Sequence, residues 1–346
     1  MLRRGGRSVA GLEISSAYVV AASTKGSERQ IDLAGSRPLR DGIVRDGEVL
    51  EPHSLAAVLE ELFTQARLPS TVRVGITNQS TVMRILELPA GIERREIGDA
   101  IRFQMPELIP LPADDVVFSH ELLGTFPTAA GPRTRVIVVA ARRKMVEDLL
   151  SAVTEAGLVP AGVDLSAFAL IRRVYQSQDA GRTTCYLGVG GLSHLSVAVD
   201  GVCTFSRVLA AGEDQMASQL LGRIGLPRDR AHQTMIDLGD EHQPADAPEA
   251  DPELGEVVRE VLLTGTSRIA DEIRGTLEFY AAHDHGPAPE RLVISGPGCS
   301  LPGLVEGLRK SLNLEIEVRI IGSAPFGLDP ALLQVAAGLT SSEVGR

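Results

Sequence analysis

The chain begins with a pattern typical of a β-hairpin. Residues 11–23, GLEISSAYVVAAS, alternate between apolar and polar side chains, break at Ser15 and Ser16, and then become apolar again. Alternation predicts a half-buried strand, and the break with its two small hydroxyl residues predicts a tight turn. We therefore expect a strand, a turn and a second strand, with Glu13 just before the turn.

A second hairpin with the same features lies about half a chain length further on. Residues 184–189 and 195–199 are predicted strands around Gly190 and Gly191, and Gly188 stands before this turn as the glutamate stands before the first one. Self-similarity at a fixed separation is the sequence signature of an internal repeat. The two hairpins therefore predict a duplicated fold.

Strand and helix patterns follow one another between the hairpins and after them, which is typical of α/β and α+β domains. Apolar residues predict helices at residues 53–68, 92–105, 143–157 and 258–283, and short apolar runs predict strands at residues 71–77, 81–89, 134–141 and 291–295. The apolar faces of the second and fourth helices consist of Ile92, Ile97, Ile101 and Met105, and of Leu262, Ile269, Ile273, Leu277 and Tyr280.

Composition and charge narrow the classes of function. The 346 residues have a formal net charge of −11, contain no Trp and are 3% aromatic. Proteins bind a phosphate backbone through basic surfaces, and they bind single-stranded nucleic acid through aromatic side chains that stack on the bases. We therefore expect no nucleic acid as a partner. The three cysteines are widely spaced without a C-x-x-C pair, which is typical of reduced, buried thiols.

None of the segments has the pattern of a membrane anchor. The basic N-terminus, MLRRGGRSVAG, lacks the apolar core of a signal peptide, and no window approaches the roughly 20 apolar residues of a spanning helix. We expect a cytoplasmic protein without direct membrane insertion, so that any link to a membrane is made through a partner.

Five segments together carry a resemblance to a known family. They are DGIVRDGEV at residues 41–49, IRFQMPELIPLPADDVVF at 101–118, AGLVPAGVDLSAFAL at 156–170, DEIRGTLEFY at 271–280 and SGPGCSLPGL at 295–304. In this order, and over nearly the whole chain, the sequence resembles the type IV pilus assembly protein PilM family, which is related to the cell-division protein FtsA and to actin-like ATPases.

The resemblance implies an α/β, actin-like (ribonuclease H-like duplicated) fold with two lobes, a nucleotide cleft between them and an inserted α/β subdomain. The expected division is 1–80 for the first lobe core, 81–163 for the inserted subdomain, 164–182 for the first lobe completion, 183–215 for the second lobe core, 216–289 for its helical subdomain, 290–324 for the second lobe completion and 325–346 for a C-terminal helix returning to the first lobe.

The resemblance also implies that three turns hold ATP with Mg²⁺ in the cleft, and the sequence departs from the family pattern at each turn. In actin-like ATPases, both hairpin turns carry an acidic residue that orients Mg²⁺ and a glycine that leaves room for the phosphates. The first turn here keeps a carboxylate, Glu13, and the hydroxyl group of Ser16. Ser15, however, replaces the glycine, and its Cβ is expected to crowd a phosphate.

The other two turns depart in different ways. The second turn keeps Gly190 and Gly191 but has Gly188 in place of the carboxylate. The third turn keeps Gly296 and Gly298, with a proline between them where the family usually has a second glycine, and proline has no N–H to offer.

A helix that covers the base and ribose in related sequences departs as well, since His232 and Met235 stand where the pattern A-E-x-x-K has Glu and Lys. The four departures together imply that ATP with Mg²⁺ binds weakly or not at all and that hydrolysis is lost. Restoring Gly188→Asp with Ser15→Gly is expected to raise nucleotide affinity. The sequence thus favours a non-enzyme; the alternative is an active actin-like ATPase or phosphotransferase.

Other groups of chemically reactive side chains have simpler interpretations. His283 and His285 lie close together in a loop, but no cysteine is near in sequence, so we expect no metal site. Asp164 is expected to cap the helix that follows it, and Asp200 to form a hairpin turn with the next glycine.

The resemblance implies a scaffold of the type IV pilus assembly machine that binds the cytoplasmic tail of the inner-membrane protein PilN, with the pilus motor ATPases as further candidate partners. Two other classes stay open. One is an FtsA-like division protein, against which the lack of a C-terminal amphipathic helix argues. The other is the cytoplasmic component of a type II secretion system.

The resemblance places the PilN tail in a groove where the inserted subdomain meets the first lobe. Residues 105–112 put apolar side chains beside three prolines, in a stretch that we expect not to be regular helix. A rigid apolar surface captures an extended peptide at low entropic cost. Ile109 and Leu111 are therefore candidate partner-binding residues; the alternative is that they pack the subdomain's own core.

Overall fold

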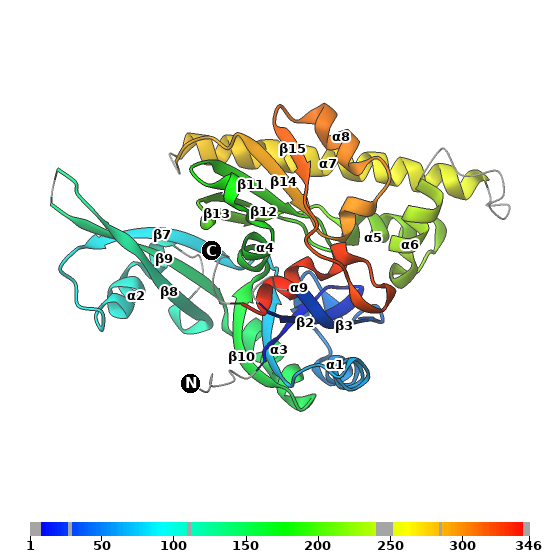
Figure 1. Ribbon diagram of the computed structural model, residues 1–346, viewed down its shortest axis with the longest axis horizontal. Coiled ribbons are helices and arrows are strands. Elements are labelled where there is room, and N and C mark those ends of the chain that lie inside the picture. Colours follow the sequence, from blue (N-terminus) through cyan, green and yellow to red (C-terminus); the bar gives the residue numbers. More distant parts are fainter. Residues whose placement is uncertain are drawn as a thin grey trace. The chain divides into compact units, whose positions relative to one another are not determined.

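The structure is a computed structural model that describes residues 8–26, 30–108, 112–129, 131–239, 252–283 and 286–341. The chain divides into two compact units (Figure 1). The larger unit combines Met1–Asn78 with Leu150–Arg346, and the smaller unit is Gln79–Leu149. Both predicted hairpins belong to the larger unit.

The first sheet of the larger unit has the strand order β10-β6-β1-β2-β3. β1 (Ala10–Ile14), β2 (Tyr18–Lys25) and β3 (Gln30–Pro38) form an antiparallel meander. β6 (Thr71–Ile76) runs parallel to β1, and β10 (Val159–Leu165) runs parallel to β6. The strand–turn–strand pattern predicted for the N-terminal segment is confirmed.

The second sheet repeats this arrangement, with the order β13-β12-β11-β14-β15. β11 (Thr183–Gly188), β12 (His194–Val199) and β13 (Val202–Val208) form an antiparallel meander. β14 (Arg291–Ser295) runs parallel to β11, and β15 (Glu315–Val318) runs parallel to β14. Strand order and directions match those of the first sheet, so the predicted internal duplication is confirmed.

Helices and short elements connect and cover the two sheets. The helices are α1 (Pro52–Ala66), α4 (Ser166–Val174), α5 (Glu213–Ile224), α6 (Arg228–Gly239), α7 (Pro252–Ala282), α8 (Leu304–Ser311) and α9 (Gln334–Leu339), with α3 (Arg143–Glu155) at the boundary of the units. The short elements are β4 (Val44–Arg45), β5 (Glu48–Val49), η2 (Ser177–Asp179), η3 (Pro297–Ser300), η4 (Pro325–Gly327) and η5 (Pro330–Leu333).

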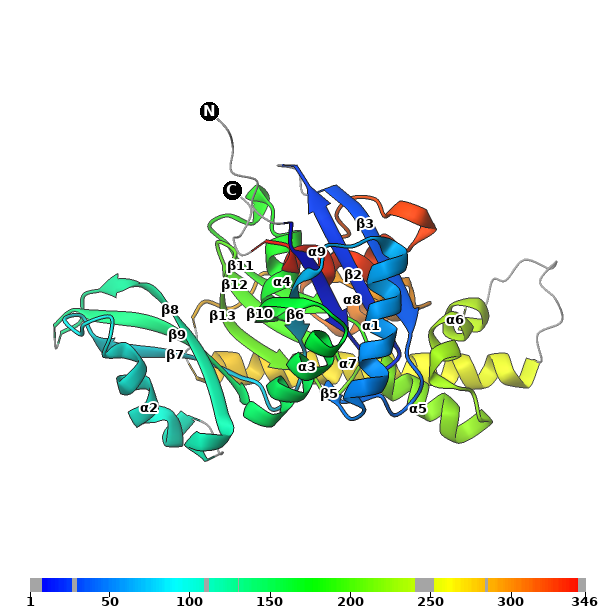
Figure 2. The ribbon, with the colours of Figure 1, turned by 90° about the horizontal axis from the view of Figure 1, so that it is seen from below.

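The main apolar core lies between the second sheet and its helices. α7, the long helix in Figure 1 and Figure 2, packs against α5, α6 and α8. The predicted apolar face of this helix is confirmed: Leu262, Ile269, Ile273 and Tyr280 are buried, and Leu277 packs against them. This burial holds α5 and α6 in place beside the second hairpin.

The smaller unit is a three-stranded antiparallel sheet packed on one helix. Its strands are β7 (Val82–Pro89), β8 (Val116–Phe126) and β9 (Arg133–Arg142), in the order β7-β9-β8. The apolar face of α2 (Ile97–Leu108) packs on the sheet, and η1 (Ala113–Asp115) precedes β8.

α2 differs from the sequence-based prediction at both ends. It begins later, at Ile97, and it continues through Pro106 to Leu108. The prediction that this proline-containing stretch excludes regular helix is therefore wrong up to Leu108. Ile101 and Met105 are buried against the sheet, and this packing outweighs the hydrogen bond that Pro106 cannot donate.

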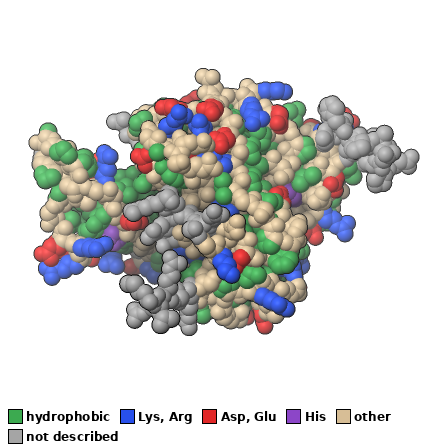
Figure 3. All heavy atoms as spheres, in the orientation of Figure 1, with side chains coloured by type: hydrophobic (Ala, Val, Ile, Leu, Met, Phe, Trp, Pro, Cys, Tyr) green, Lys and Arg blue, Asp and Glu red, His purple; other side chains and the backbone are tan. Residues whose placement is uncertain are grey.

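The surface and the helices add two general observations. Across the described ranges, no helix is long and apolar enough to cross a membrane. On the described part of the face in Figure 3, acidic and basic side chains are intermingled rather than gathered into a broad basic area.

The chain crosses twice between the two sheets of the larger unit. First, α4 and η2 lead from β10 to β11. Later, the chain leaves β15 and reaches η5 and α9, and α9 packs against β1, β2, β6 and α4. The relative position of the sheets therefore depends on how these two connections are held.

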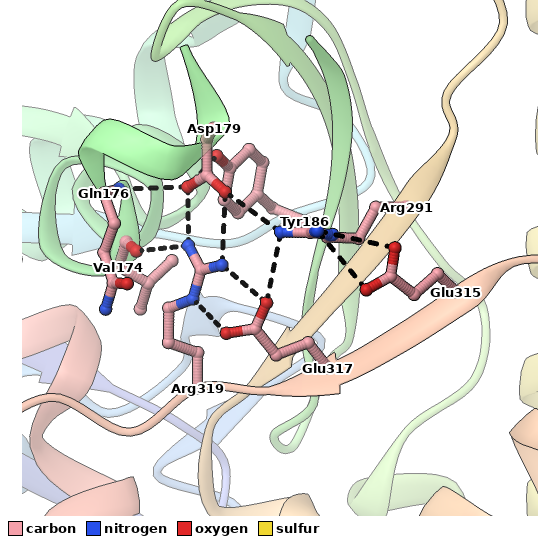
Figure 4. Close-up of polar contacts among 8 residues, drawn as sticks. All are labelled: Val174, Gln176, Asp179, Tyr186, Arg291, Glu315, Glu317 and Arg319. Atoms are coloured by element: carbon pink, nitrogen blue, oxygen red, sulfur yellow. Dashed lines mark hydrogen bonds and ion pairs between the residues drawn. The ribbon is translucent and has the colours of Figure 1, made fainter.

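A buried ion pair joins the two crossings (Figure 4). Arg319, after β15, donates to both carboxylate oxygens of Asp179 at 2.5 and 3.2 Å and to the backbone oxygen of Val174 at 2.9 Å. Glu317 also accepts from Arg319, at 2.7 Å, and the Tyr186 hydroxyl donates to Asp179 at 3.3 Å. Burial acts to raise the pKa of Asp179, but the hydrogen bonds from Arg319, the Gln176 backbone and Tyr186, together with the charge of Arg319, outweigh it, and the pKa is lowered.

Candidate functional site

A pocket of about 410 Å³ in the larger unit brings the predicted turns together. Its walls come from the first turn, the end of β3, the second turn, the start of α5, α6, η3 and η5. The Ser16 hydroxyl, in the first turn, donates to Asp214 at 2.7 Å, and Asp214 lies beside Gly191 in the second turn. The two turns, one from each sheet, therefore face a shared pocket.

Ser15 stabilises the first turn through its own backbone. Its hydroxyl oxygen accepts from the N–H groups of Ala17 at 3.3 Å and Tyr18 at 3.2 Å, and the hydroxyl also lies 3.2 Å from the Tyr18 carbonyl oxygen. Such bonds to nearby amides are a common serine turn motif. Ser15 therefore engages two N–H groups that a phosphate-binding turn would offer to an anion.

Glu13 is poorly suited to hold a divalent cation. Burial, and after it the negative charge of Glu213, raises the pKa of Glu13 to about 8. The carboxyl group is therefore mostly protonated at pH 7. Because Mg²⁺ binds ionised carboxylates, the turn keeps an acidic residue without keeping an effective ligand.

His194 fills the space beside Gly188, where the family pattern has a carboxylate. The two residues are paired across β11 and β12, and a Cβ at Gly188 would lie 2.3 Å from Nε2 of His194. Burial lowers the pKa of His194 to about 4, so the ring is neutral at pH 7. The substitution Gly188→Asp, expected from the sequence to restore affinity, has no room while this ring is present.

Asp214 fills the space that Gly191 leaves. A Cβ at Gly191 would lie 2.9 Å from either carboxylate oxygen of Asp214. Gly212 allows α5 to start against the second turn, since its own Cβ would lie 2.4 Å from the Gly191 oxygen. The N–H groups of Glu213 and Asp214 donate to the carbonyl oxygens of Gly190 and Gly191, at 2.9 and 3.0 Å.

The third turn packs against the second one. Gly296 has a φ of +99°, a conformation that favours glycine, and a Cβ there would lie 2.5 Å from the Val189 oxygen. The N–H of Gly298 donates to the same oxygen at 3.1 Å, and its Cβ position is 2.2 Å from a methyl group of Val189. Packing alone therefore requires both glycines.

α6 contributes an ion pair and a core residue to the pocket wall. Nδ1 of His232 lies 2.8 Å from Oε2 of Glu213. Burial acts to lower the pKa of His232, but the hydrogen bond and charge of Glu213 outweigh it, and the pKa is raised. Oε1 of Glu213 is buried without a hydrogen-bond partner among the described groups, and Met235 is fully buried in the core of the second sheet.

The pocket residues that the sequence did not predict include Tyr18, Glu213, Asp214 and Arg228. Arg228 donates to the Asp214 carbonyl oxygen at 3.1 Å and lies 3.3 Å from a carboxylate oxygen of Asp41, near the first sheet. One usable signal was present, since a glycine followed by two acidic residues opens an amphipathic helix soon after the second hairpin.

Candidates outside the pocket have structural roles. Asp164 does not cap α4; it pairs with Arg172 at 2.5 Å, so the capping prediction is wrong. Asp200, with a φ of +52°, forms the predicted turn between β12 and β13.

Within the described part of the chain, no group of three or more His, Cys, Asp or Glu could hold a metal ion. His283 contacts a backbone oxygen one turn earlier, and His285 lies outside the described residues, as do Ile109 and Leu111.

The nucleotide implied by the resemblance, ATP with Mg²⁺, does not fit these turns as they are folded. Two backbone N–H groups are bonded to Ser15, the carboxylate of Asp214 fills the space at Gly191, and Glu13 is mostly protonated. A triphosphate would need all three of these positions.

Two sheets of the same topology, each starting with a hairpin whose turn faces a shared pocket, define an actin-like fold. Solved structures have the same fold. The ethanolamine utilization protein EutJ from Carboxydothermus hydrogenoformans aligns with a TM-score of 0.54 and 15% identity, over 96% of this chain and 88% of that chain. MreB5 of Spiroplasma citri bound to ADP aligns with a TM-score of 0.54 and 11% identity, over 95% and 94%.

Residues 11–324 match the family described as type IV pilus assembly protein PilM. The chain therefore belongs to this family. A solved structure described as a PilM-PilN type IV pilus biogenesis complex aligns with a TM-score of 0.78 and 24% identity, over 97% of this chain and 98% of that chain. The resemblance found in the five sequence segments and the actin-like fold class are both confirmed.

Proposed function

We propose that the protein is a cytoplasmic scaffold of the type IV pilus assembly machine, attached to the inner membrane by binding the cytoplasmic tail of PilN. The observation that carries the proposal is the family match over residues 11–324. The near-complete alignment with a chain of a PilM-PilN complex supports PilN as the partner. The pilus motor ATPases are further proposed partners.

The second part of the proposal is that the nucleotide cleft is catalytically degenerate. Phosphoryl transfer depends on a held Mg²⁺ and on donors placed around the phosphates. Glu13 is mostly protonated, Gly188 has a histidine ring in place of a carboxylate, and Ser15 engages the amides of its own turn. These three features support a cleft that keeps the fold of an ATPase without its chemistry.

We further propose that Ile109 and Leu111 contact the PilN tail. Their sequence context, apolar side chains between prolines, offers a surface that loses little entropy when it binds an extended peptide.

Titration of a fluorescent peptide of the PilN tail tests this partner assignment. Ile109→Asp and Leu111→Asp should each weaken binding at least tenfold. Leu263→Asp is the matched control, because Leu263 is 74% exposed on α7 in the larger unit, and it should bind like wild type. If wild-type protein does not bind the peptide, the scaffold proposal is refuted. If all variants bind it equally, the segment that contains Ile109 and Leu111 is not part of the interface.

Phosphate release tests the chemistry. Wild-type protein with ATP and Mg²⁺ should release phosphate no faster than a buffer control. Rapid release that Glu13→Ala abolishes would identify an active ATPase and overturn the degenerate cleft, whatever the result with the peptide.

A further inference from the structure

The hydrogen bond between Ser16 and Asp214 connects the two hairpin turns directly. The Ser16 hydroxyl lies before β2 of the first sheet, and Asp214 lies in the first turn of α5, beside the second sheet. Ser16 is buried and Asp214 is partly buried, and their donor–acceptor distance is 2.7 Å. A carboxylate of the chain itself thus spans the gap that anionic phosphates bridge when two such turns hold a nucleotide.

In both turns, the positions that could bind an anion are already occupied by the chain's own groups. On the first turn, the amides of Ala17 and Tyr18 donate to Ser15. On the second turn, both oxygens of Asp214 lie 2.9 Å from the Cβ position of Gly191, so the chain's own anion occupies the room that this glycine provides.

The charge of the pocket also opposes an added anion. Glu213, Asp214, Asp229 and Asp329 contribute carboxylates to its walls. Of the two cationic groups in the wall, His232 pairs with Glu213, and Arg228 forms an ion pair at 3.3 Å with Asp41, which lies outside the pocket; Nε of Arg228 has no hydrogen-bond partner among the described groups. At short range in a partly buried site, carboxylates repel a polyphosphate strongly.

The rest of the pocket suits a neutral ligand with hydrogen-bond donors. Ala217, Ala231, Met235 and Leu332 give part of its wall an apolar character. The buried Oε1 atom of Glu213 is an acceptor with no partner in the described structure. The volume of about 410 Å³ falls within the usual range for small-molecule pockets.

We propose that this pocket binds a neutral nucleoside, through its ring and its O–H and N–H donors, and that Asp214 is the specificity-determining residue that excludes the phosphates. The proposal rests on the proposed loss of catalysis and deepens it, because it assigns a ligand class to the cleft that no longer turns over ATP. Asp214 then acts by its charge, and Ser16 holds its side chain in position.

Calorimetric titration of the full chain with adenosine, ADP and ATP, with and without Mg²⁺, tests the ligand class. Wild-type protein should bind adenosine at least tenfold more tightly than ATP. Asp214→Asn keeps the shape and an acceptor for Ser16 but removes the charge, so it should improve ATP binding at least tenfold while adenosine affinity changes less than threefold. Asp271→Asn removes the same charge at an exposed position of α7 outside the pocket lining, and it should leave both affinities near wild type.

Three results would overturn the proposal: tighter binding of ATP than of adenosine by wild type, no binding of adenosine at millimolar concentration, or equal effects of the two Asn variants. The wild-type comparison decides the ligand class even if Asp214→Asn does not fold, and Asp214→Ser offers a second neutral variant. ATP that binds tightly without hydrolysis would refute this inference alone, whereas the phosphate-release and peptide experiments test the proposed function.

Discussion

The imidazole ring of His194 and the missing side chain of Gly188 are complementary. The ring lies so close to the Cβ position of Gly188 that any larger residue must displace it, and the ring is buried. The two residues therefore depend on each other, and replacing Gly188 alone by a larger residue creates a clash.

This complementarity predicts an energetic coupling. Gly188→Ala should lower the free energy of unfolding by about 1–3 kcal/mol, the usual cost of overpacking. His194→Ala removes the clashing ring. In urea unfolding, the double variant with Gly188→Ala and His194→Ala should therefore lose less free energy of unfolding than the two single variants lose in sum. Gly222→Ala, in α5 with open space around its Cβ position, is the control and should be neutral or stabilising. Additive losses would refute the coupling.

The carboxyl group of Glu13 predicts a dependence of stability on pH. Its pKa is about 8 in the folded protein and near 4.5 when unfolded, so between these values the folded state holds the proton more tightly. Its contribution to stability is therefore greatest below pH 4.5 and is lost as pH rises to 8, by about 1.4 kcal/mol for each pH unit between the two pKa values.

Unfolding by urea at several pH values between 5 and 8 measures this effect. Glu13→Gln has a neutral side chain at every pH, so its free energy of unfolding should decline less as the pH rises. The difference from wild type should be greatest near pH 8. Glu306→Gln changes an exposed carboxylate on α8 and should follow the wild-type curve. Parallel curves for wild type and Glu13→Gln would show that Glu13 does not carry the pH dependence. Glu213 and Tyr18 interact with Glu13, and Asp214 interacts with Tyr18.

At the scale of elements, the crossings η2 and β15–η5 are held by Asp179 and Arg319 (Figure 4). Arg319→Ala should lower the free energy of unfolding by roughly 3–5 kcal/mol, because it removes both short hydrogen bonds from a cation to a buried carboxylate and leaves only Arg291, at 3.6 Å, as a charged partner. The double variant Asp179→Asn with Arg319→Met should lose less free energy of unfolding than Arg319→Ala, because it removes both charges together. Glu315→Gln, at the exposed edge of the same network, should cost less than about 1 kcal/mol. Equal losses for Arg319→Ala and Glu315→Gln would contradict this role.

Elements with a clear hydrophobic period could be predicted from the sequence, and elements without one could not. The hairpins and α7 follow strand and helix periods closely. β3 and β8 were not predicted, and both are edge strands. β8 is exposed over most of its length, so it lacks the alternation that burial of one face imposes. In β3 the alternation is limited to residues 30–33, and the strand buries little more than Ala34.

At the scale of the whole molecule, the site could be predicted only in part because both sheets build it. The repeat of the hairpins was visible in the sequence and led to Ser16, Gly190 and Gly191. Asp214 was not found, because its place between the turns depends on α5 starting against the second turn and on the first sheet facing it. Local periodicity carries no information about such a contact. The division of the larger unit into lobes at the predicted boundaries stays a prediction.

The last prediction concerns how the larger unit responds to its ligands. Contacts from Ser16 to Asp214 and from Asp41 to Arg228 already join its two sides without a nucleotide. A ligand stabilises a protein only in proportion to its binding, by about 2.7 kcal/mol at a hundredfold excess over Kd. In thermal unfolding, the PilN tail peptide at that excess should therefore raise Tm by several degrees, whereas millimolar ATP with Mg²⁺ should shift it by less than about 1 °C. Asp214→Asn should gain a shift with ATP and keep the shift with the peptide, because the charge that excludes phosphates is separate from the proposed PilN contacts. A wild-type shift with ATP as large as the shift with the peptide would show that the cleft still closes on nucleotide.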